Sequence, residues 1–391
     1  MLPDSEYITQ TLARLVQINS INPDLDPAGP GEAEIAAYTA ERLRTLGCEI
    51  LRREPRPGRV SVAGTLKGSG GGPSLMLYAH LDTVSVEGMA EPWSGAVRNG
   101  RLYGRGAYDM KCGLASCLGA LKALRDSGTA LRGDLVIAAA ADEETESIGM
   151  SDLLTAVHTD AAIVTEPTEL DLYVAHKGFA WIEVETLGRA AHGSRYQDGI
   201  DANLRMGRFL AALAGLERQV REGPRHRLLG PASLHAAVLR GGSGWSTYAA
   251  SCRLEIERRT LPGESPELVL AEITALLEQL RRDDPTFEAR ARLVVYRPPL
   301  EGTAESPIAR AVLAAAHAAG RRPEIAGAGY WMDAALIAAA GIETVVIGPT
   351  GAGAHAAEEW VELDSVVTLA GILADAAIRY CGVSEATPRL R

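Results

Sequence analysis

Apolar positions along the chain follow two spacings, and each spacing predicts one kind of element. Apolar residues three to four positions apart predict helices over 5–19, 32–47 and 110–128. Continuous apolar runs bounded by Gly, Pro or polar residues predict strands at 59–68, 74–80, 134–140 and 160–166. Buried strands that alternate with helices indicate a mainly parallel sheet covered on both faces.

The pattern changes after Lys177. The expected elements, in chain order, are strand 179–188, helix 202–222, strands 233–242 and 248–260, helix 265–280 and strand 287–297. This β-α-β-β-α-β order is that of the split, ferredoxin-like unit. It indicates a second domain inserted into the first.

Helix and strand patterns alternate again from about Arg297. The expected elements are helices 306–320 and 331–341, strand 343–348 and a long helix over 363–380. We therefore predict an α/β protein whose mainly parallel-sheet domain is built from 1–178 and 297–391, with a ferredoxin-like domain inserted at 179–296.

Composition excludes several classes of protein. The 391 residues are 47% hydrophobic and 23% charged, which is ordinary for a soluble globular protein of two domains. A net charge of −11 argues against nucleic acid or an anionic membrane as partner. Five cysteines without CxxC spacing indicate neither a disulfide framework nor a thiolate zinc site. Without a signal-peptide pattern or a bilayer-length apolar run, we expect a cytoplasmic protein.

Imidazole and carboxylate side chains recur just after the predicted strands. They are His80, Glu143, Glu144, Glu166 and His355, joined by Asp109 in the Gly-rich GRGAYDMK loop before a helix. Open α/β sheets bind ligands at the carboxyl ends of their strands, so these side chains are expected to converge. Singly, each has an ordinary structural explanation, such as a helix cap; together they favour a metal site.

The residue types suit a catalytic metal centre. Zinc accepts imidazole and carboxylate ligands, and five ligands suit two cations that share a carboxylate better than a single ion. Asp82 lies two residues after His80, where it can accept the second ring N–H of that histidine. Adjacent Glu143 and Glu144 point in opposite directions along an extended chain, so one can bind metal while the other faces the water as general base.

At these residues the chain resembles the co-catalytic zinc amidohydrolases, which include acetylornithine deacetylase, succinyl-diaminopimelate desuccinylase, glutamate carboxypeptidase and aminoacylase. The matching stretches are HLDTV, GRLYGRGAYDMKCGLAS, ADEE, VTEPTELDLYVAHKG, AAHGS, RRTLPGE and GAGAHAAEEWV. The resemblance assigns one metal to His80, Asp109 and Glu166, a second to Asp109, Glu144 and His355, and the base to Glu143. Zinc is the expected metal, with cobalt or manganese as alternatives.

The resemblance also implies residues for the substrate. His192 matches the histidine that stabilises the oxyanion and that, in relatives, reaches the active site of the neighbouring subunit. Arg259 matches the arginine that binds the α-carboxylate of the substrate, and Asn203 sits where relatives often have a polar residue near a substrate oxygen. The inserted domain is then a lid and dimerisation domain of a homodimer. Without the resemblance, His192 and Arg259 would be read as surface residues.

One stretch departs from the family pattern. Where relatives commonly have a Gly-Thr-Asp loop, this chain reads GAGYWMDAAL, with Tyr330, Trp331 and Met332. These bulky side chains either line an apolar or aromatic pocket or pack beneath the following helix.

The predicted activity is hydrolysis of the N-acyl amide bond of an N-acyl-α-amino acid, as in acetylornithine deacetylase. Glu166, rather than the aspartate usual in aminopeptidase relatives, resembles the deacylase and carboxypeptidase branches. The alternatives are a dinuclear zinc carboxypeptidase or dipeptidase acting on short peptides, or a desuccinylase-like enzyme. A non-catalytic metal-binding homologue is a further alternative, but it should lack a ligand or the base, and none is missing here.

Overall fold

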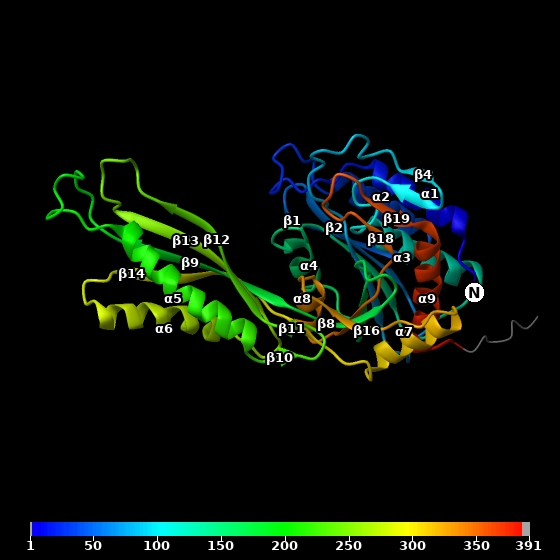
Figure 1. The fold of residues 1–391 in the computed structure, drawn as a ribbon. Coiled ribbons are helices and arrows are strands. Elements are labelled where there is room, and N and C mark those ends of the chain that lie inside the picture. Colours follow the sequence, from blue (N-terminus) through cyan, green and yellow to red (C-terminus); the bar gives the residue numbers. More distant parts are fainter. Residues whose placement is uncertain (1, 385–391) are drawn as a thin grey trace, which may run out of the picture. The chain divides into compact units, whose positions relative to one another are not determined.

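The computed structural model describes residues 2–384 and divides into two compact units (Figure 1). The first unit combines the described parts of Met1–Val174, Gly302–Gly327 and Met332–Arg391, and the second combines Ala175–Glu301 with Ala328–Trp331. Among residues 2–384, no helix has both the length and the apolar character needed to cross a lipid bilayer.

The first unit is built on a mixed sheet. Its strands, in spatial order, are β1 (Glu49–Arg56), β2 (Arg59–Leu66), β6 (Leu135–Ala140), β3 (Leu75–His80), β7 (Ala161–Val164), β17 (Glu343–Val346) and β8 (Leu172–His176). The four central strands β6, β3, β7 and β17 run parallel, whereas β1, β2 and β8 are antiparallel to their neighbours. Strands β3, β6 and β7 are buried along their length, as both-sided coverage by helices requires.

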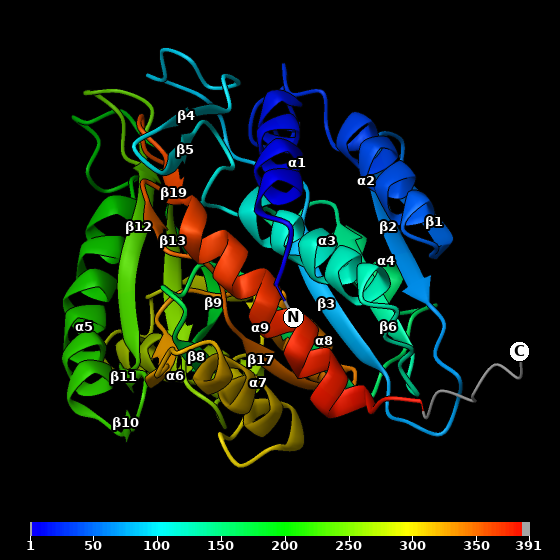
Figure 2. The ribbon, with the colours of Figure 1, turned by 90° about the vertical axis from the view of Figure 1, so that its right-hand side faces the viewer.

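Helices cover this sheet. They are α1 (Ser5–Gln17), α2 (Ala33–Thr45), α3 (Lys111–Asp126), α4 (Ile148–Leu153), α7 (Pro307–Ala318), α8 (Ala334–Ala339) and α9 (Leu363–Cys381). Figure 2 shows α1, α3 and α9 together in front of the sheet. Gly119 of α3 permits this packing, because a Cβ at that position would lie 2.6 Å from the Ile8 side chain of α1.

A second, small sheet of the first unit brings two loops together. It consists of β18 (Gly351–Ala352), β19 (Trp360–Glu362), β5 (Arg101–Tyr103) and β4 (Ala96–Arg98), in that order. Trp360 of β19 pairs with Tyr103 of β5, so the segment before α3 and the segment before α9 are joined by a ladder of hydrogen bonds.

The second unit has the predicted β-α-β-β-α-β order. Its antiparallel sheet runs β12 (Ser233–Gly241), β13 (Ser251–Thr260), β9 (Gly178–Leu187) and β14 (Ala289–Arg297), with helices α5 (Ala202–Glu222) and α6 (Pro266–Asp283). A short hairpin of β10 (Arg225–His226) and β11 (Gly230–Pro231) follows α5. The predicted fold class, a mainly parallel α/β domain with an inserted ferredoxin-like domain, is confirmed.

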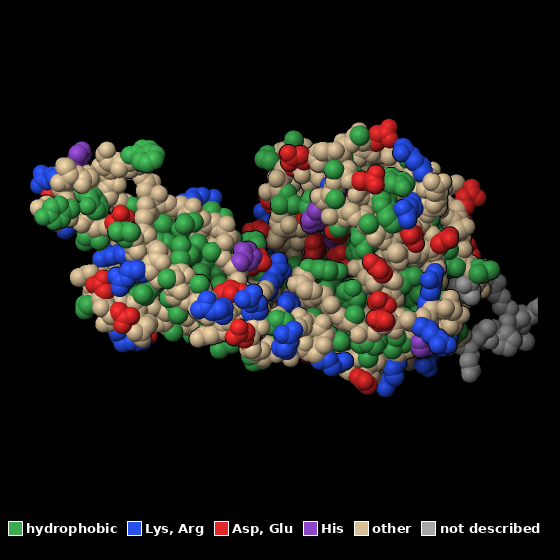
Figure 3. Space-filling view, viewed as in Figure 1, with side chains coloured by type: hydrophobic (Ala, Val, Ile, Leu, Met, Phe, Trp, Pro, Cys, Tyr) green, Lys and Arg blue, Asp and Glu red, His purple; other side chains and the backbone are tan. Residues whose placement is uncertain are grey.

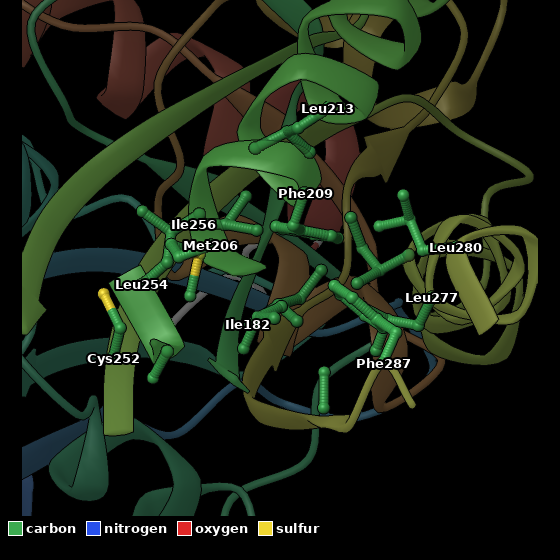
Figure 4. Close-up of a cluster of buried hydrophobic side chains, with 14 of the residues drawn as sticks. Ile182, Met206, Phe209, Leu213, Cys252, Leu254, Ile256, Leu277, Leu280 and Phe287 are labelled. Carbon is green, nitrogen blue, oxygen red and sulfur yellow. The ribbon is translucent and has the colours of Figure 1, made fainter. Parts of the chain in front are cut away.

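The helices of the second unit bury one face of its sheet. Along β9, Ala180, Ile182 and Val184 are buried, while the side chains between them are more exposed. Figure 4 shows Phe209 of α5 and Leu277 of α6 beside Ile182, in an apolar cluster to which Ala180 and Val184 also belong. The other face of the sheet therefore carries the polar and aromatic side chains discussed below.

The boundaries of the second unit differ from the predicted 179 and 296. It begins at Ala175 and ends at Glu301, because the end of β8 pairs with β15 (Leu300–Glu301), and His176 lies opposite Leu300. It also includes Ala328–Trp331, at the end of β16 (Ile325–Ala328), which pairs with β8.

Candidate active site

Three neighbouring parallel strands deliver the predicted site residues to one edge of the first unit's sheet. His80 is the last residue of β3, Glu143 and Glu144 follow β6, and Glu166 follows β7. The strands end level with one another, since His80 lies opposite Ala140 of β6. Side chains far apart in sequence are thus neighbours, as expected for the carboxyl ends of an open α/β sheet.

Two loops complete the group. Asp109 lies in the turn before α3, and His355 lies between β18 and β19 with a positive φ of 61°. The two oxygens of Asp109 face different histidines. Oδ1 is 3.2 Å from Nε2 of His80, and Oδ2 is 3.3 Å from Nε2 of His355. A carboxylate placed in this way can serve two cations at once.

The other two carboxylates each lie beside one of these histidines. Oε2 of Glu144 is 3.2 Å from Nε2 of His355, and Oε1 of Glu166 is 3.7 Å from Nε2 of His80. Ligand atoms of His80, Asp109 and Glu144 all lie within 4.8 Å of one another, as do those of His80, Glu143 and Glu166. Figure 3 shows Asp and Glu side chains recessed beneath a histidine on the first unit.

The protonation of this cluster reflects its burial and crowding. Burial raises the pKa of Glu166 to about 8, with a further rise from the charges of Asp109 and Glu144. Hydrogen bonds to Asp109 and Glu144 raise the pKa of His355 to about 10. Burial acts to raise the pKa of Asp109, but hydrogen bonds from both histidines outweigh it and lower that pKa. Without cations, the cluster thus holds extra protons at neutral pH.

The donor set fits two divalent cations. Two imidazoles and three carboxylates converge, and Oε1 of Glu144 is buried without a hydrogen-bond partner among the described residues. A buried carboxylate oxygen left without a donor is costly, and a cation removes that cost. Imidazole and carboxylate together suit zinc, cobalt or manganese.

Glu143 differs from its neighbour Glu144. Within residues 2–384, its carboxylate forms no hydrogen bond or ion pair with the imidazole of His80 or of His355, although it lies near His80 and Glu166. Burial raises the pKa of Glu143 well above its ordinary value, and the charges of Glu166 and Asp333 add to the rise. A half-buried carboxyl with a raised pKa beside a ligand cluster is suited to take up a proton.

Asp82 positions both His80 and the turn that carries Glu143 and Glu144. Nδ1 of His80 is 3.0 Å from the main-chain oxygen of Asp82 and 3.6 Å from its carboxylate. That carboxylate accepts hydrogen bonds from the main-chain N–H groups of Glu143 and Glu144, and from Nδ2 of Asn22 at 2.8 Å. Asp82 therefore holds the Glu143–Glu144 turn as well as the histidine, and Asn22 was not foreseen from the sequence.

A buried ion pair joins the Asp109 loop to the His355 loop. Nη1 of Arg105 is 2.6 Å from Oε2 of Glu359, and both side chains are almost fully buried. Oε1 of Glu359 accepts hydrogen bonds from the N–H groups of Tyr108 and Asp109, while Nη2 of Arg105 donates to the main-chain oxygen of Ala356. The pair thus fixes the backbone that carries two of the candidate ligands. Glu359 lies in the AAEEWV stretch after His355, where the sequence alone does not distinguish it from Glu358.

The three residues predicted to contact substrate lie in the second unit. His192 is exposed in the loop after β9, with Nδ1 2.8 Å from Oγ of Ser194. Asn203 is exposed in the first turn of α5 and packs against Gly241, where a Cβ would lie 2.1 Å from its Oδ1. Arg259, on β13, donates from Nε to Oε1 of Glu257 at 2.8 Å.

The Tyr330–Trp331–Met332 stretch was predicted either to line an apolar or aromatic pocket or to pack beneath the following helix, and its residues differ in this respect. Met332 is 1% exposed and belongs to the core of the first unit, whereas Tyr330 is 47% exposed. Trp331 lies in the second unit, edge-on to the ring of Phe179. The helix predicted over 331–341 begins only at Ala334, because Asp333 occupies the N-cap position and 330–332 are not helical.

Comparisons with known proteins place the chain in a wider context. Residues 76–379 match the Peptidase family M20/M25/M40. The chain is 32% identical over 386 residues to the acetylornithine deacetylase of Myxococcus xanthus, covering 95% of this chain and 97% of that protein. It is 29% identical over 383 residues to the N-formyl-4-amino-5-aminomethyl-2-methylpyrimidine deformylase of Bacillus subtilis, covering 89% of each.

Solved structures share the fold at low sequence identity. The aminopeptidase PepT of Bacillus cereus superposes with a TM-score of 0.80 at 19% identity, covering 97% of this chain and 99% of that one. A dinuclear metal binding peptidase of Bacillus subtilis gives a TM-score of 0.74 at 17% identity, covering 96% and 97%. The family suspected from the motifs is confirmed.

Proposed function

Because the chain belongs to peptidase family M20/M25/M40, whose members hydrolyse amide bonds, we propose that it removes the acyl group from an N-acyl-α-amino acid. The observation that carries this proposal is Asp109, whose two oxygens face His80 and His355 separately. Such an arrangement suits a pair of metal ions acting on one water. The acetylornithine deacetylase relative supports the choice of an acylated amino acid as substrate.

In this proposal His80, Asp109 and Glu166 hold one cation, and Asp109, Glu144 and His355 hold the other. Two such cations, when bound, polarise the scissile carbonyl and acidify the attacking water. Zinc is the proposed metal, because imidazole and carboxylate donors suit it, with cobalt or manganese as alternatives.

Glu143 is the proposed general base. Its carboxylate accepts a proton from the attacking water, and the resulting carboxylic acid then gives that proton to the nitrogen of the leaving amine. Asp82 keeps this turn in place through the two main-chain N–H groups of Glu143 and Glu144. The proton thus passes from the water through Glu143 to the amine nitrogen. The water oxygen bonds to the carbonyl carbon and the carbon–nitrogen bond breaks, so the products are a carboxylic acid, which ionises, and a free amine.

Residues of the second unit are proposed to bind the substrate. The guanidinium of Arg259 pairs with the α-carboxylate, and the imidazole of His192 donates to the oxyanion that forms at the scissile carbonyl. Asn203 is proposed to contact a substrate oxygen. The exposure of His192 and Asn203 is compatible with roles that need a partner from outside their own unit.

A substrate panel on metal-reconstituted protein tests the activity. We expect release of free amine from N-acetyl-α-amino acids, and no release after chelation of the metal. The carboxypeptidase or dipeptidase alternative predicts instead that dipeptides with the same C-terminal residue are cleaved faster. A desuccinylase-like enzyme would prefer the N-succinyl form of the same amino acid. Absence of hydrolysis across the panel in metal-loaded protein would support a non-catalytic homologue.

We also propose a cytoplasmic homodimer in which His192 acts in the active site of the partner subunit. Exposed large apolar side chains of the second unit support it: Trp245 is fully exposed, Tyr196 is 70% exposed and Leu239, on edge strand β12, is 53% exposed. The backbone of His192 forms an isolated β-bridge with Thr247, two residues beyond Trp245. All five cysteines are unpaired thiols, which suits a reducing compartment.

Mixing two inactive variants tests the dimer. If His192 acts across the interface, His192→Ala and Glu143→Ala subunits form mixed dimers with one complete site. Random exchange then restores about a quarter of wild-type activity. If His192 acts within its own subunit, each site keeps one defect and mixing restores nothing.

A further inference from the structure

The second unit gathers large aromatic side chains around Arg259. The whole chain has only 3 Phe and 5 Trp among 391 residues, yet Phe179, Trp181 and Trp331 lie together. The ring of Phe179 is 5.3 Å from that of Trp181 and 6.0 Å from that of Trp331, measured between centroids. We call these three residues the aromatic cluster. Its concentration in an aromatic-poor chain calls for an explanation beyond ordinary packing.

Strand pairing places the aromatic cluster against the arginine. Phe179 on β9 lies directly opposite Arg259 on β13, and Trp181 lies opposite Glu257. All four side chains point to the face of the sheet that α5 and α6 leave open. Cζ of Arg259 is 5.4 Å from the centroid of the Phe179 ring, so the guanidinium is held over an aromatic face.

The guanidinium keeps one edge available. Nε of Arg259 donates to Oε1 of Glu257, whose other oxygen accepts from Nε1 of Trp181 at 3.1 Å. Among the described residues, neither terminal nitrogen of Arg259 has a hydrogen-bond partner, and its side chain is 30% exposed. The edge formed by those two nitrogens suits a carboxylate bidentately. Whatever is attached to that carboxylate then lies within reach of the neighbouring rings.

Both signs of charge occur around Arg259 and the aromatic cluster, and the carboxylates are already paired. Burial and the positive charge of Arg259 lower the pKa of Lys177, and Arg297 lies over the Trp331 ring, 5.7 Å from its centroid. Glu257 is engaged by Arg259 and Trp181. Glu183 and Glu255, which line the groove beside Trp181, pair with Arg292 and Arg240. A substrate side chain ending in an ammonium group would therefore compete with arginines for these carboxylates, whereas an apolar ring would meet other rings.

We infer that the substrate is an N-acyl-α-amino acid with an aromatic or bulky apolar side chain, and that the aromatic cluster contacts that side chain. This inference rests on the proposed function, in which Arg259 binds the α-carboxylate. It separates the chain from the acetylornithine deacetylase relative, whose named substrate carries an amino group on its side chain.

Four substrates test the inference: the N-acetyl derivatives of L-phenylalanine, L-tryptophan, L-norvaline and L-ornithine. Norvaline has the carbon chain of ornithine without its charge, so it separates size from charge. We expect kcat/KM for the two aromatic substrates to exceed that for acetylnorvaline by about tenfold or more, and acetylornithine to be the slowest. Acetylornithine equal to or faster than the aromatic substrates would overturn the inference and leave the proposed function standing. Hydrolysis of none of the four would count against both.

Substitution in the aromatic cluster provides a second measurement. Trp181→Ala removes a ring that is 45% exposed, and Leu268→Ala on α6 removes an apolar side chain of similar exposure, 47%, from the same unit. We expect Trp181→Ala to lower the acetylphenylalanine to acetylnorvaline ratio of kcat/KM by about tenfold, and Leu268→Ala to leave it unchanged. A general loss of stability would lower both rates and leave the ratio intact. An unchanged ratio in Trp181→Ala therefore overturns the inference.

Discussion

The two units hold their candidate functional residues in opposite ways. In the first unit, polar atoms of His80, Asp109, Glu144, Glu166 and His355 each lie within 3.7 Å of another member of the group, and buried neighbours fix them. In the second unit, His192, Asn203 and Arg259 come from a loop, a helix and a strand, and two of them are exposed. The first unit therefore holds a full set of candidate ligands already assembled. The residues proposed for the second unit would need a substrate or another chain to act together.

The largest expected effect is in the first unit. Glu143→Ala should keep its metal content but lose about 10²- to 10⁴-fold in kcat, because the water loses its proton acceptor. Metal analysis and steady-state kinetics measure the two properties separately. Glu146→Ala is the matched control, since Glu146 lies in the same turn but is 65% exposed and pairs with Arg56. A Glu143→Ala enzyme within tenfold of wild type would refute the assignment.

Metal affinity should also depend on the buried ion pair between Arg105 and Glu359. Glu359→Ala leaves the Arg105 guanidinium buried without its carboxylate, which costs about 3–5 kcal/mol in the free energy of unfolding. It also frees the N–H groups of the Asp109 turn, so metal affinity should fall about 10- to 100-fold.

Urea unfolding and calorimetric metal titration measure these two effects. The adjacent Glu358 is exposed, and Glu358→Ala serves as the control that should change neither. If the Glu359→Ala and Glu358→Ala variants bind metal with the same affinity, Glu359 does not position Asp109.

A smaller and more selective effect is expected in the second unit. Arg259→Ala should lower kcat/KM about 10- to 100-fold for an N-acetyl amino acid, since a charge-assisted pair to the carboxylate is lost. For the corresponding N-acetyl amino acid amide, which lacks that charge, kcat/KM of the same variant should change little. Arg253→Ala on the same strand, where Arg253 pairs with Glu183, is the control. Equal losses toward acid and amide would show that Arg259 does not bind the carboxylate.

The smallest effect is the pH dependence of the metal-free protein. The pKa of Glu166 is raised from 4.5 to about 8 and that of His355 from 6.5 to about 10, so the folded state binds more protons than the unfolded state between these values. Stability of the metal-free protein should therefore fall as pH rises from 5.5 to 8.5.

Divalent metal removes this dependence by replacing the protons, so the rise in melting temperature on metal addition should be larger at pH 8.5 than at pH 5.5. Differential scanning calorimetry with and without chelator measures it. A metal-free protein that is more stable at pH 8.5 than at pH 5.5 would contradict the raised pKa values of Glu166 and His355.

Much of the fold could be predicted because apolar periodicity reports burial. Helix α5 was predicted over 202–222 and has those bounds, and the buried strands β3 and β6 were placed to within a residue. Strand β1 was missed because its sequence, EILRREPR, is charged and mostly exposed, so it lacks the apolar signal. The order of strands in the sheet was not predictable, since pairing partners are distant in sequence.

The candidate site shows the same limit. Residues at strand ends were found because strands predict where their ends meet. Glu359 was not found, because Glu358 and Glu359 are identical in type and only the fold buries the second. Asn22 was not found because its partner, Asp82, lies 60 residues away with no pattern linking them. The side-chain roles in the second unit came from family resemblance, and periodicity alone would have left them as surface residues.

The closeness of four carboxylates makes the charge of the first unit's cluster depend on metal loading. With neutral histidines, Asp109, Glu143, Glu144 and Glu166 contribute four negative charges, which one dication would half neutralise and two dications would balance. A partly loaded enzyme would therefore repel an anionic substrate more strongly than the fully loaded enzyme, so apparent affinity for acylated amino acids should vary with the supply of metal.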